Sequence, residues 1–122
     1  MKFEELTPYQ IELISNGCGA KASCLKPPHS IFFKASCDKH DIGYFQGGSE
    51  EDRLECDIKF LQAMLEDCAK VKNRISRYRY ILWSYLYFAA VRAYGFQYFT
   101  YRHQRLTLEQ VIYYFEKENS CY

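Results

Sequence analysis

The chain has 122 residues, which is the length of one domain. Hydrophobic residues make up 48% and charged residues 25%, a balance that excludes a disordered or low-complexity chain. Sixteen basic and fifteen acidic residues leave a net charge of +1, which disfavours a dedicated nucleic-acid binder. The longest uncharged stretch, Tyr80–Val91, is too short to span a bilayer, so we expect no transmembrane segment.

Helical spacing recurs in segments bounded by start and stop signals, roughly over residues 7–16, 33–46, 49–68, 76–94 and 107–118. The first and the last segments open with a Thr-x-x-Gln capping box, at Thr7 and at Thr107. The third opens at Ser49 with three acids, which favour a helix N-terminus. A Gly- and Pro-rich loop covers 17–30, and strands amount to a short hairpin at most. Four or five helices in a single domain over 1–122 predict a mostly α protein.

The fourth segment is crowded with aromatic residues, most of which we expect in the core with their hydroxyls hydrogen-bonded. These residues are Tyr78, Tyr80, Trp83, Tyr85, Tyr87, Phe88 and Tyr94. Five arginines are predicted to form a solvated face, with attraction to anionic lipid as the alternative: Arg74, Arg77, Arg79, Arg92 and Arg102. His29 and His103 are expected at the surface without partners.

Polar residues with catalytic chemistry gather around His40. His40 and Tyr44 are four residues apart and share a helix face with Cys37, while Asp41 lies about 100° further round. The preceding run of residues 16–19, Asn-Gly-Cys-Gly, offers backbone carbonyls. Carbonyls and a carboxylate are hard oxygen donors, as in a calcium site, and a neutral His beside such a cation suits a general base acting on water.

Asp57 is the candidate partner that orients this base. It lies on the stripe that the third segment shares with Leu54, Ile58 and Leu61. If this segment packs antiparallel to the second across the turn at 46–48, Asp57 meets His40. A buried Asp that accepts one imidazole N–H fixes the tautomer and stabilises the imidazolium. The pair includes no serine, so water is the expected nucleophile.

The spacing Cys-x-x-His-Asp-x-x-Tyr, over residues 37–44, resembles the active-site helix of the secreted phospholipase A2 superfamily. Residues 16–19 resemble its calcium loop, and Cys56-Asp57 resembles its second helix. Gly43 stands where vertebrate and venom enzymes have Cys, so the segment is more similar to the bacterial and fungal branch. Residues 90–95, after Trp83, are similar to the C-terminal helix of that branch. The resemblance covers roughly residues 16–95.

The resemblance implies a phospholipase A2-like fold, with two antiparallel active-site helices, a Gly-rich calcium loop and additional C-terminal helices. It implies calcium-dependent hydrolysis of the sn-2 ester of glycerophospholipids at a membrane surface or micelle. His40 is the implied general base, Asp57 orients it, and Tyr44 donates a hydrogen bond to Asp57.

The implied calcium ligands are Asp41 and the carbonyls of Gly17 and Gly19, with Asn16 or Lys21 as alternatives for a further ligand. A Cys18–Cys37 bridge is implied between loop and helix, and Gly43 leaves Cys56 without the partner of the vertebrate enzymes. The remaining cysteines, Cys24, Cys68 and Cys121, have no assigned partner.

The sequence leaves open two alternative functions and the cellular compartment of the protein. Cys18, Cys24, Cys37 and His40 are the residues of a possible structural Cys₃His zinc site. A catalytically inactive phospholipase-like binding protein is the other alternative. Six cysteines favour an oxidising, secreted destination, whereas the acidic N-terminal residues Glu4 and Glu5 are unlike a signal peptide.

Overall fold

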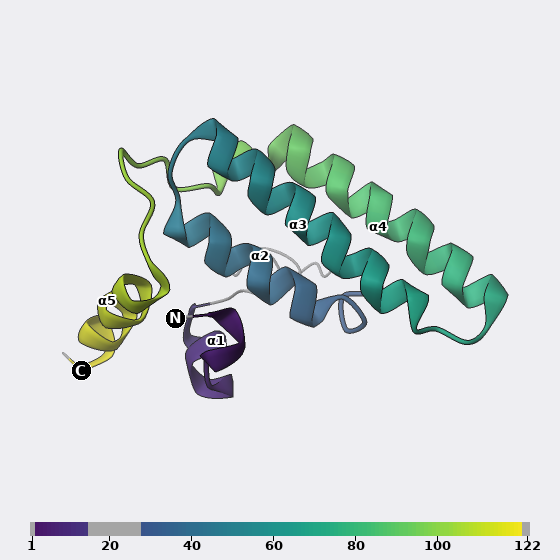
Figure 1. Cartoon of the computed structure of the whole chain (residues 1–122), viewed down its shortest axis with the longest axis horizontal. Coiled ribbons are helices and arrows are strands. Elements are labelled where there is room, and N and C mark those ends of the chain that lie inside the picture. The colour runs from purple at the N-terminus through teal and green to yellow at the C-terminus, as the bar shows by residue number, and fades with distance from the viewer. Residues whose placement is uncertain (1, 15–27, 121–122) are drawn as a thin grey trace.

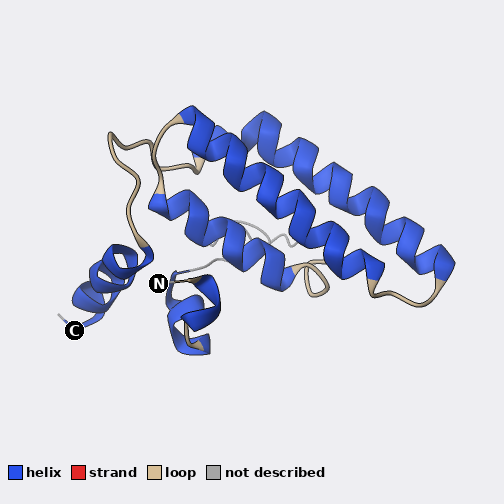
Figure 2. Cartoon of the chain, in the orientation of Figure 1, coloured by secondary structure: helices blue, strands red, loops and turns tan. Residues whose placement is uncertain are grey.

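The structure is a computed structural model that describes residues 2–14 and 28–120 (Figure 1). In these ranges the chain forms five α-helices and two short 3-10 turns, without a strand (Figure 2). The α-helices are α1 (Pro8–Ile14), α2 (Lys34–Gln46), α3 (Glu50–Ala69), α4 (Arg74–Tyr94) and α5 (Leu108–Ser120). The turns are η1 (Phe3–Glu5) and η2 (Gly95–Gln97). The predicted mostly α class is confirmed, and in place of a hairpin there is an isolated bridge between Gly48 and Tyr101.

The capping signals of the sequence act as predicted. The Ser49 hydroxyl accepts the Asp52 amide at the start of α3, and the Asp52 carboxylate accepts the Ser49 amide. Reciprocal bonds of the same kind open α1 at Thr7 and α5 at Thr107. The helix α4 begins two residues before the expected start because the Asn73 side chain accepts the Ser76 amide at 3.0 Å.

Three long helices lie side by side, with α3 between α2 and α4, and α1 and α5 lie together on the side of α2 (Figure 1). The chain reverses direction between α2 and α3 at Gly47, whose φ of 71° suits a residue without a Cβ. The segment after α4 runs back along this turn, where Leu106 N donates to Gln46 O and Arg102 N to Gly48 O. The helices α2 and α3 are therefore antiparallel, and a distant part of the chain holds them at one end.

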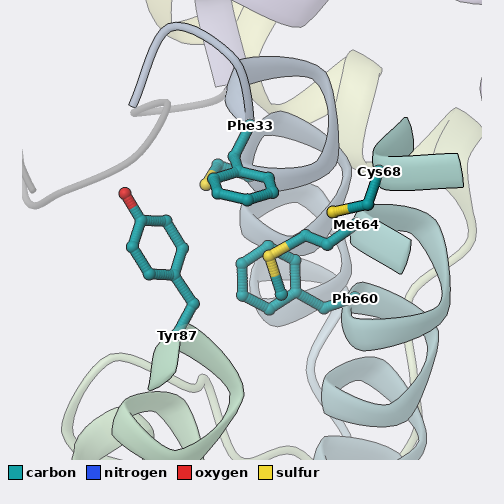
Figure 3. Close-up of a cluster of buried hydrophobic side chains, with 6 residues drawn as sticks. Phe33, Phe60, Met64, Cys68 and Tyr87 are labelled. Carbon is teal, nitrogen blue, oxygen red and sulfur yellow. The ribbon is translucent and has the colours of Figure 1, made fainter. Parts of the chain in front are cut away.

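The main core lies between α2, α3, α4 and the turn before α2. Its buried members include Phe33, Phe60, Met64, Cys68 and Tyr87 (Figure 3). The buried side of α3 differs from the predicted stripe, since Leu54 and Ile58 are each 41% exposed. The residues of α3 that are buried are Arg53, Asp57, Phe60, Met64 and Cys68. Compared with the predicted stripe, α3 is rotated so that both Arg53 and Asp57 face inward, where their opposite charges form an ion pair.

A second, smaller cluster joins α1 and α5 to the other side of α2. Its buried members are Leu6, Ile14, Ile42 and Val111. The helix α2 therefore contributes to both clusters, with Cys37 in one and Ile42 in the other.

The expectation that most aromatic residues of α4 belong to the core holds only in part. Tyr87 is buried and Tyr80, Trp83 and Phe88 are half-buried. Tyr78, Tyr85 and Tyr94 are exposed, because α3 and the turn at 28–33 cover only one side of α4. His29, expected without partners, instead packs edge-on against Tyr80 and Trp83. Within the described ranges, no helix combines the length and the apolar character needed to cross a membrane.

Candidate active site

His40 of α2 and Asp57 of α3 meet in the interior between the long helices. His40 Nε2 lies 2.8 Å from Asp57 Oδ1, and the Tyr44 hydroxyl donates to the same oxygen at 2.6 Å. The Asp57 side chain is 0% exposed and that of His40 is buried. An ionised carboxylate only accepts hydrogen bonds, so the Nε2 of His40 carries the proton and Nδ1 is left with a lone pair. The three predicted catalytic residues are thus in contact.

Aromatic rings fix the plane of the His40 imidazole. Its ring stacks on Phe60 at a centroid distance of 4.4 Å and lies 4.1 Å from the Tyr44 ring. Gly95, the residue after α4, allows this packing, because a Cβ at that position would collide with the Tyr44 hydroxyl. The glycine at the end of α4 therefore has a role in the site as well as in helix termination.

Two arginines neutralise the Asp57 carboxylate, and the sequence interpretation did not assign either of them to the site. Arg92 Nη1 of α4 lies 2.6 Å from Asp57 Oδ2, which corrects the prediction that Arg92 belongs to a solvated face. Arg53 Nη1 of α3 lies 3.6 Å from the same oxygen. Arg53 is four residues before Asp57, a spacing that signals a helical ion pair. Arg92 is 35 residues away and has no such local signal.

Glu50, the first residue of α3, contacts both arginines on their sides away from Asp57. Its carboxylate accepts from Arg53 Nη2 at 2.7 Å and lies 3.4 Å from Arg92 Nη2, and the Tyr101 hydroxyl also donates to it. Hydrogen bonds from Arg53 and Tyr101 lower the pKa of Glu50 to about 2. The acidic start of α3 therefore aligns the arginines that face Asp57.

The electrostatics of Asp57 favour an ionised carboxylate. Burial alone would raise its pKa, but hydrogen bonds from His40, Tyr44 and Arg92 together hold that pKa below its usual value. Burial and the hydrogen bond to Asp57 raise the pKa of Tyr44, so the phenol stays protonated as a donor. The site thus holds one fixed negative charge beside the imidazole.

His40 borders a pocket of about 130 Å³ in the groove between α2 and α3. Its apolar walls are Phe3, Ile42, Phe60, Ala63 and Leu108, of which all but Ala63 belong to the two clusters. Among the described residues that line it, three are basic, Lys39, Lys59 and Arg105, and none is acidic. Arg105 donates to the carbonyls of Gly43 and Gly47 rather than to a carboxylate. The pocket therefore has an apolar interior with a positive charge bias.

The predicted calcium site falls mostly outside the described residues. Gly17 and Gly19 lie there, as do the alternatives Asn16 and Lys21. Asp41 is described and half-buried, and it follows His40 directly on α2. Among residues 2–14 and 28–120, no three His, Cys, Asp or Glu side chains gather as a metal site would require. The expected calcium site has one carboxylate, and its other ligands are backbone carbonyls, so it stays a prediction for Asp41.

The cysteines bear on the bridge and on the zinc alternative. Cys56 and Cys68 are free, and Cys37 is buried in the main core. Cys18 lies outside the described residues, so the Cys18–Cys37 pairing stays a prediction. The zinc alternative needs Cys18 and Cys24, which both lie outside the described residues, so it stays an alternative.

In comparisons with protein-family models, with curated proteins and with solved structures, no match to the chain was found. The likeness to the secreted phospholipases A2 thus depends on the motif residues and on how they meet in space.

Proposed function

We propose that the protein is a calcium-dependent phospholipase A2-type esterase that hydrolyses the sn-2 ester of glycerophospholipids. The observation that carries the proposal is the buried contact of His40, Asp57 and Tyr44 beside a largely apolar pocket. A His–Asp pair in which Asp fixes the tautomer is a general-base arrangement, and such bases contribute about 10²–10⁴-fold to a rate.

The proposed chemistry follows from the protonation of the imidazole. With the Nε2 proton held by Asp57, the lone pair of Nδ1 takes a proton from water, and the resulting hydroxide attacks the ester carbonyl. The imidazolium that forms is stabilised by Asp57 and then gives its proton to the leaving alkoxide. Tyr44 and Arg92 keep the carboxylate oriented during both steps.

The proposed calcium ligands are Asp41 and carbonyls of the 16–21 segment. A bound calcium ion supplies Lewis-acid polarisation of the ester carbonyl and stabilises the negative charge that develops on its oxygen. His40 and Asp41 are consecutive on α2, and this supports a metal carboxylate close to the general base.

The composition of the pocket supports a substrate with an apolar chain and an anionic group. Five apolar side chains offer contact area for an acyl chain. Lys39, Lys59 and Arg105 favour a negatively charged headgroup. We therefore expect faster hydrolysis of phosphatidylglycerol than of phosphatidylcholine.

The test is release of fatty acid from mixed vesicles, with and without calcium, by the wild type, His40→Ala and the control His103→Ala. We expect calcium-dependent lysophospholipid formation by the wild type and the control, and a loss of at least about 10²-fold in His40→Ala with the fold retained. Activity that EGTA leaves unchanged would refute the metal role. Most of the activity surviving in His40→Ala would refute the general base.

A further inference from the structure

The outer side of α4 is an exposed apolar face with nothing packed on it in the described part of the chain. Ile75 is 72% exposed, Tyr78 62% and Leu82 59%, and Tyr85 and Leu86 are also exposed. The buried and half-buried residues of α4, such as Ser84 and Tyr87, lie on its opposite side against α3. Exposed apolar patches of this extent mark interaction sites.

The residues of this face recur with a heptad pattern. Ile75, Leu82 and Ala89 are seven residues apart, and so are Arg79, Leu86 and Ala93, with alternating steps of four and three. This is the spacing of the seam along which two helices pack in a coiled coil. The pattern therefore indicates a partner that is itself a helix.

Along the heptad positions the side chains are bulky in the first half of α4 and small at its far end. Ile75, Arg79 and Leu82 lie in the first half, whereas Ala89 and Ala93 follow Leu86 in the second, and Tyr85 and Tyr94 are exposed beside these positions. Two copies of α4 in antiparallel orientation place Ile75 of one copy against Ala93 of the other, with Leu82 and Leu86 meeting at the centre. Facing large and small side chains is the condition for close packing between helices.

The charges at the two ends of the α3–α4 pair favour the same orientation. Lys72 and Arg74 are exposed at the first end of α4. Its other end contacts the start of α3, where Arg92 meets Glu50, and Glu51 is exposed beside it. An antiparallel pair brings each basic end to an acidic end, whereas a parallel pair would bring the basic ends together.

We infer that α4 is a self-association surface through which two copies of this chain pair as a two-fold symmetric, antiparallel dimer. Residue i of one copy then contacts residue j of the other, and the reverse contact is made at the same time. The inference does not depend on the proposed enzymatic function. The pocket at His40 lies in the groove between α2 and α3, away from the outer side of α4, and stays open in the dimer.

The test is the mass of the full chain in solution, measured by light scattering after gel filtration and by analytical ultracentrifugation across a concentration series. We expect twice the 14.5 kDa of one chain. Leu82→Lys should raise the dissociation constant at least about 100-fold, because it buries a charge at the centre of the seam. The matched control Ile31→Lys, at a site that is 91% exposed outside α4, should leave the dimer intact.

A double substitution distinguishes a specific antiparallel interface from non-specific hydrophobic association. Ala93→Ile alone should weaken the dimer, because it places two bulky residues opposite each other. Ile75→Ala combined with Ala93→Ile should restore much of the affinity, since it exchanges the large and small sides. A wild-type monomer at all concentrations would overturn the inference, and so would an Ala93→Ile variant that associates more strongly.

A second experiment tests whether the apolar and basic outer side of α4 binds a lipid surface instead of a second copy of the chain. The wild type and Leu82→Lys are sedimented with phosphatidylglycerol vesicles and with phosphatidylcholine vesicles. Equal sedimentation of the two proteins supports self-association as the role of this face. A monomeric wild type that binds anionic vesicles through Leu82 would overturn the inference and assign α4 to a lipid surface.

Discussion

At the scale of single residues, Asp57 has four hydrogen-bonding or ionic neighbours and no contact with solvent. Its substitution by Asn keeps the shape but removes the charge that stabilises the imidazolium. The Asn amide can also donate to His40 Nε2, which moves the proton to Nδ1 and removes the lone pair that acts on water. We expect Asp57→Asn to lower the hydrolytic rate about 10²–10⁴-fold while calcium affinity barely changes, as measured by vesicle hydrolysis and calorimetry.

Asp41→Asn is the matched control for this substitution. It should weaken calcium binding first, so that added calcium recovers part of the rate. Equal loss of calcium binding in both variants would contradict the division of roles between the two carboxylates.

Asp57 also makes the stability of the protein depend on pH. The depressed pKa of Asp57 means that its contribution is present above about pH 4 and is lost as the pH falls further, and Asp57→Asn should remove this acid dependence.

Arg92 sets the charge balance around His40. Its guanidinium lies 2.6 Å from Asp57, and this hydrogen bond is one of the three that hold the pKa of Asp57 below its usual value. In Arg92→Met the pKa of Asp57 therefore rises, so that Asp57 is protonated at a higher pH than in the wild type and then no longer accepts from His40. We expect the hydrolytic rate of Arg92→Met to fall more at acidic pH than at neutral pH.

The measurement has two readouts, the pH–rate profile and the NMR titration of the Asp57 carboxyl carbon. Arg74→Met, at an exposed position of the same helix, is the control. Lys39, Lys59 and Arg105 around the pocket are unchanged in both variants. A rate that falls equally at every pH, with an unchanged Asp57 titration, would show that Arg92 is structural only.

The limits of the sequence interpretation are clear at these residues. His40, Tyr44 and Asp57 follow from helical spacing and from the antiparallel turn, because each is set by local geometry. The ion pair of Arg92 with Asp57 does not follow from local geometry, since it depends on where α4 lies relative to α3. A charged residue on a predicted helix is more often solvated, and only the neighbouring buried carboxylate reverses that expectation.

At the scale of helices, the pairing of α2 with α3 predicts an engineered disulfide. A Cβ built at Gly43 lies 3.8 Å from Cys56 Cβ and 3.0 Å from Cys56 Sγ. The first of these is the usual separation of the two Cβ atoms in a disulfide. Gly43→Cys should therefore form a bridge to Cys56 and stabilise the protein by about 3 kcal/mol in the chain-entropy model.

The bridge is detected by non-reducing peptide mass spectrometry, and its effect by thermal unfolding with and without reductant. Gly43→Ala is the control for the loss of a helix glycine, and it should gain less than about 1 kcal/mol. Free thiols at both positions after air oxidation would contradict the geometry of the helix pair. The position also fits the resemblance, because vertebrate enzymes have Cys where this chain has Gly43.

Helix boundaries were more predictable than helix faces. Caps such as Ser49 with Asp52 act within four residues, so the sequence identifies them directly. The predicted buried side of α3 is correct for Asp57 but not for Leu54 and Ile58, which hydrophobicity alone favours. The structure turns Arg53 inward beside Asp57, where ion pairs with Glu50 and Arg92 replace the missing apolar contacts. The exposure of Leu54 and Ile58 is thus a consequence of placing the site inside the bundle.

At the scale of the whole molecule, two clusters of buried residues share the helix α2. The main core joins α2, α3 and α4, and the smaller cluster holds α1 and α5 on the opposite side of α2. Small clusters of this kind open locally at a lower free energy than the main core. Phe3 and Leu108, which pack with the smaller cluster, also form a wall of the pocket, so its opening should reach the site.

Val111→Ala tests whether the smaller cluster opens independently of the main core. Val111 of α5 is fully buried, and its truncation should cost about 2 kcal/mol in the smaller cluster. We expect faster amide hydrogen exchange in α1 and α5, with protection of α3 unchanged, and weaker binding of short-chain lipid because Leu108 is no longer held. Met64→Ala is the contrasting variant, since Met64 is central to the main core and should lower protection in α2, α3 and α4 together. Equal loss of protection in α3 and α5 on Val111→Ala would show instead that both clusters unfold as one cooperative unit, and the pocket would then open only with the whole fold.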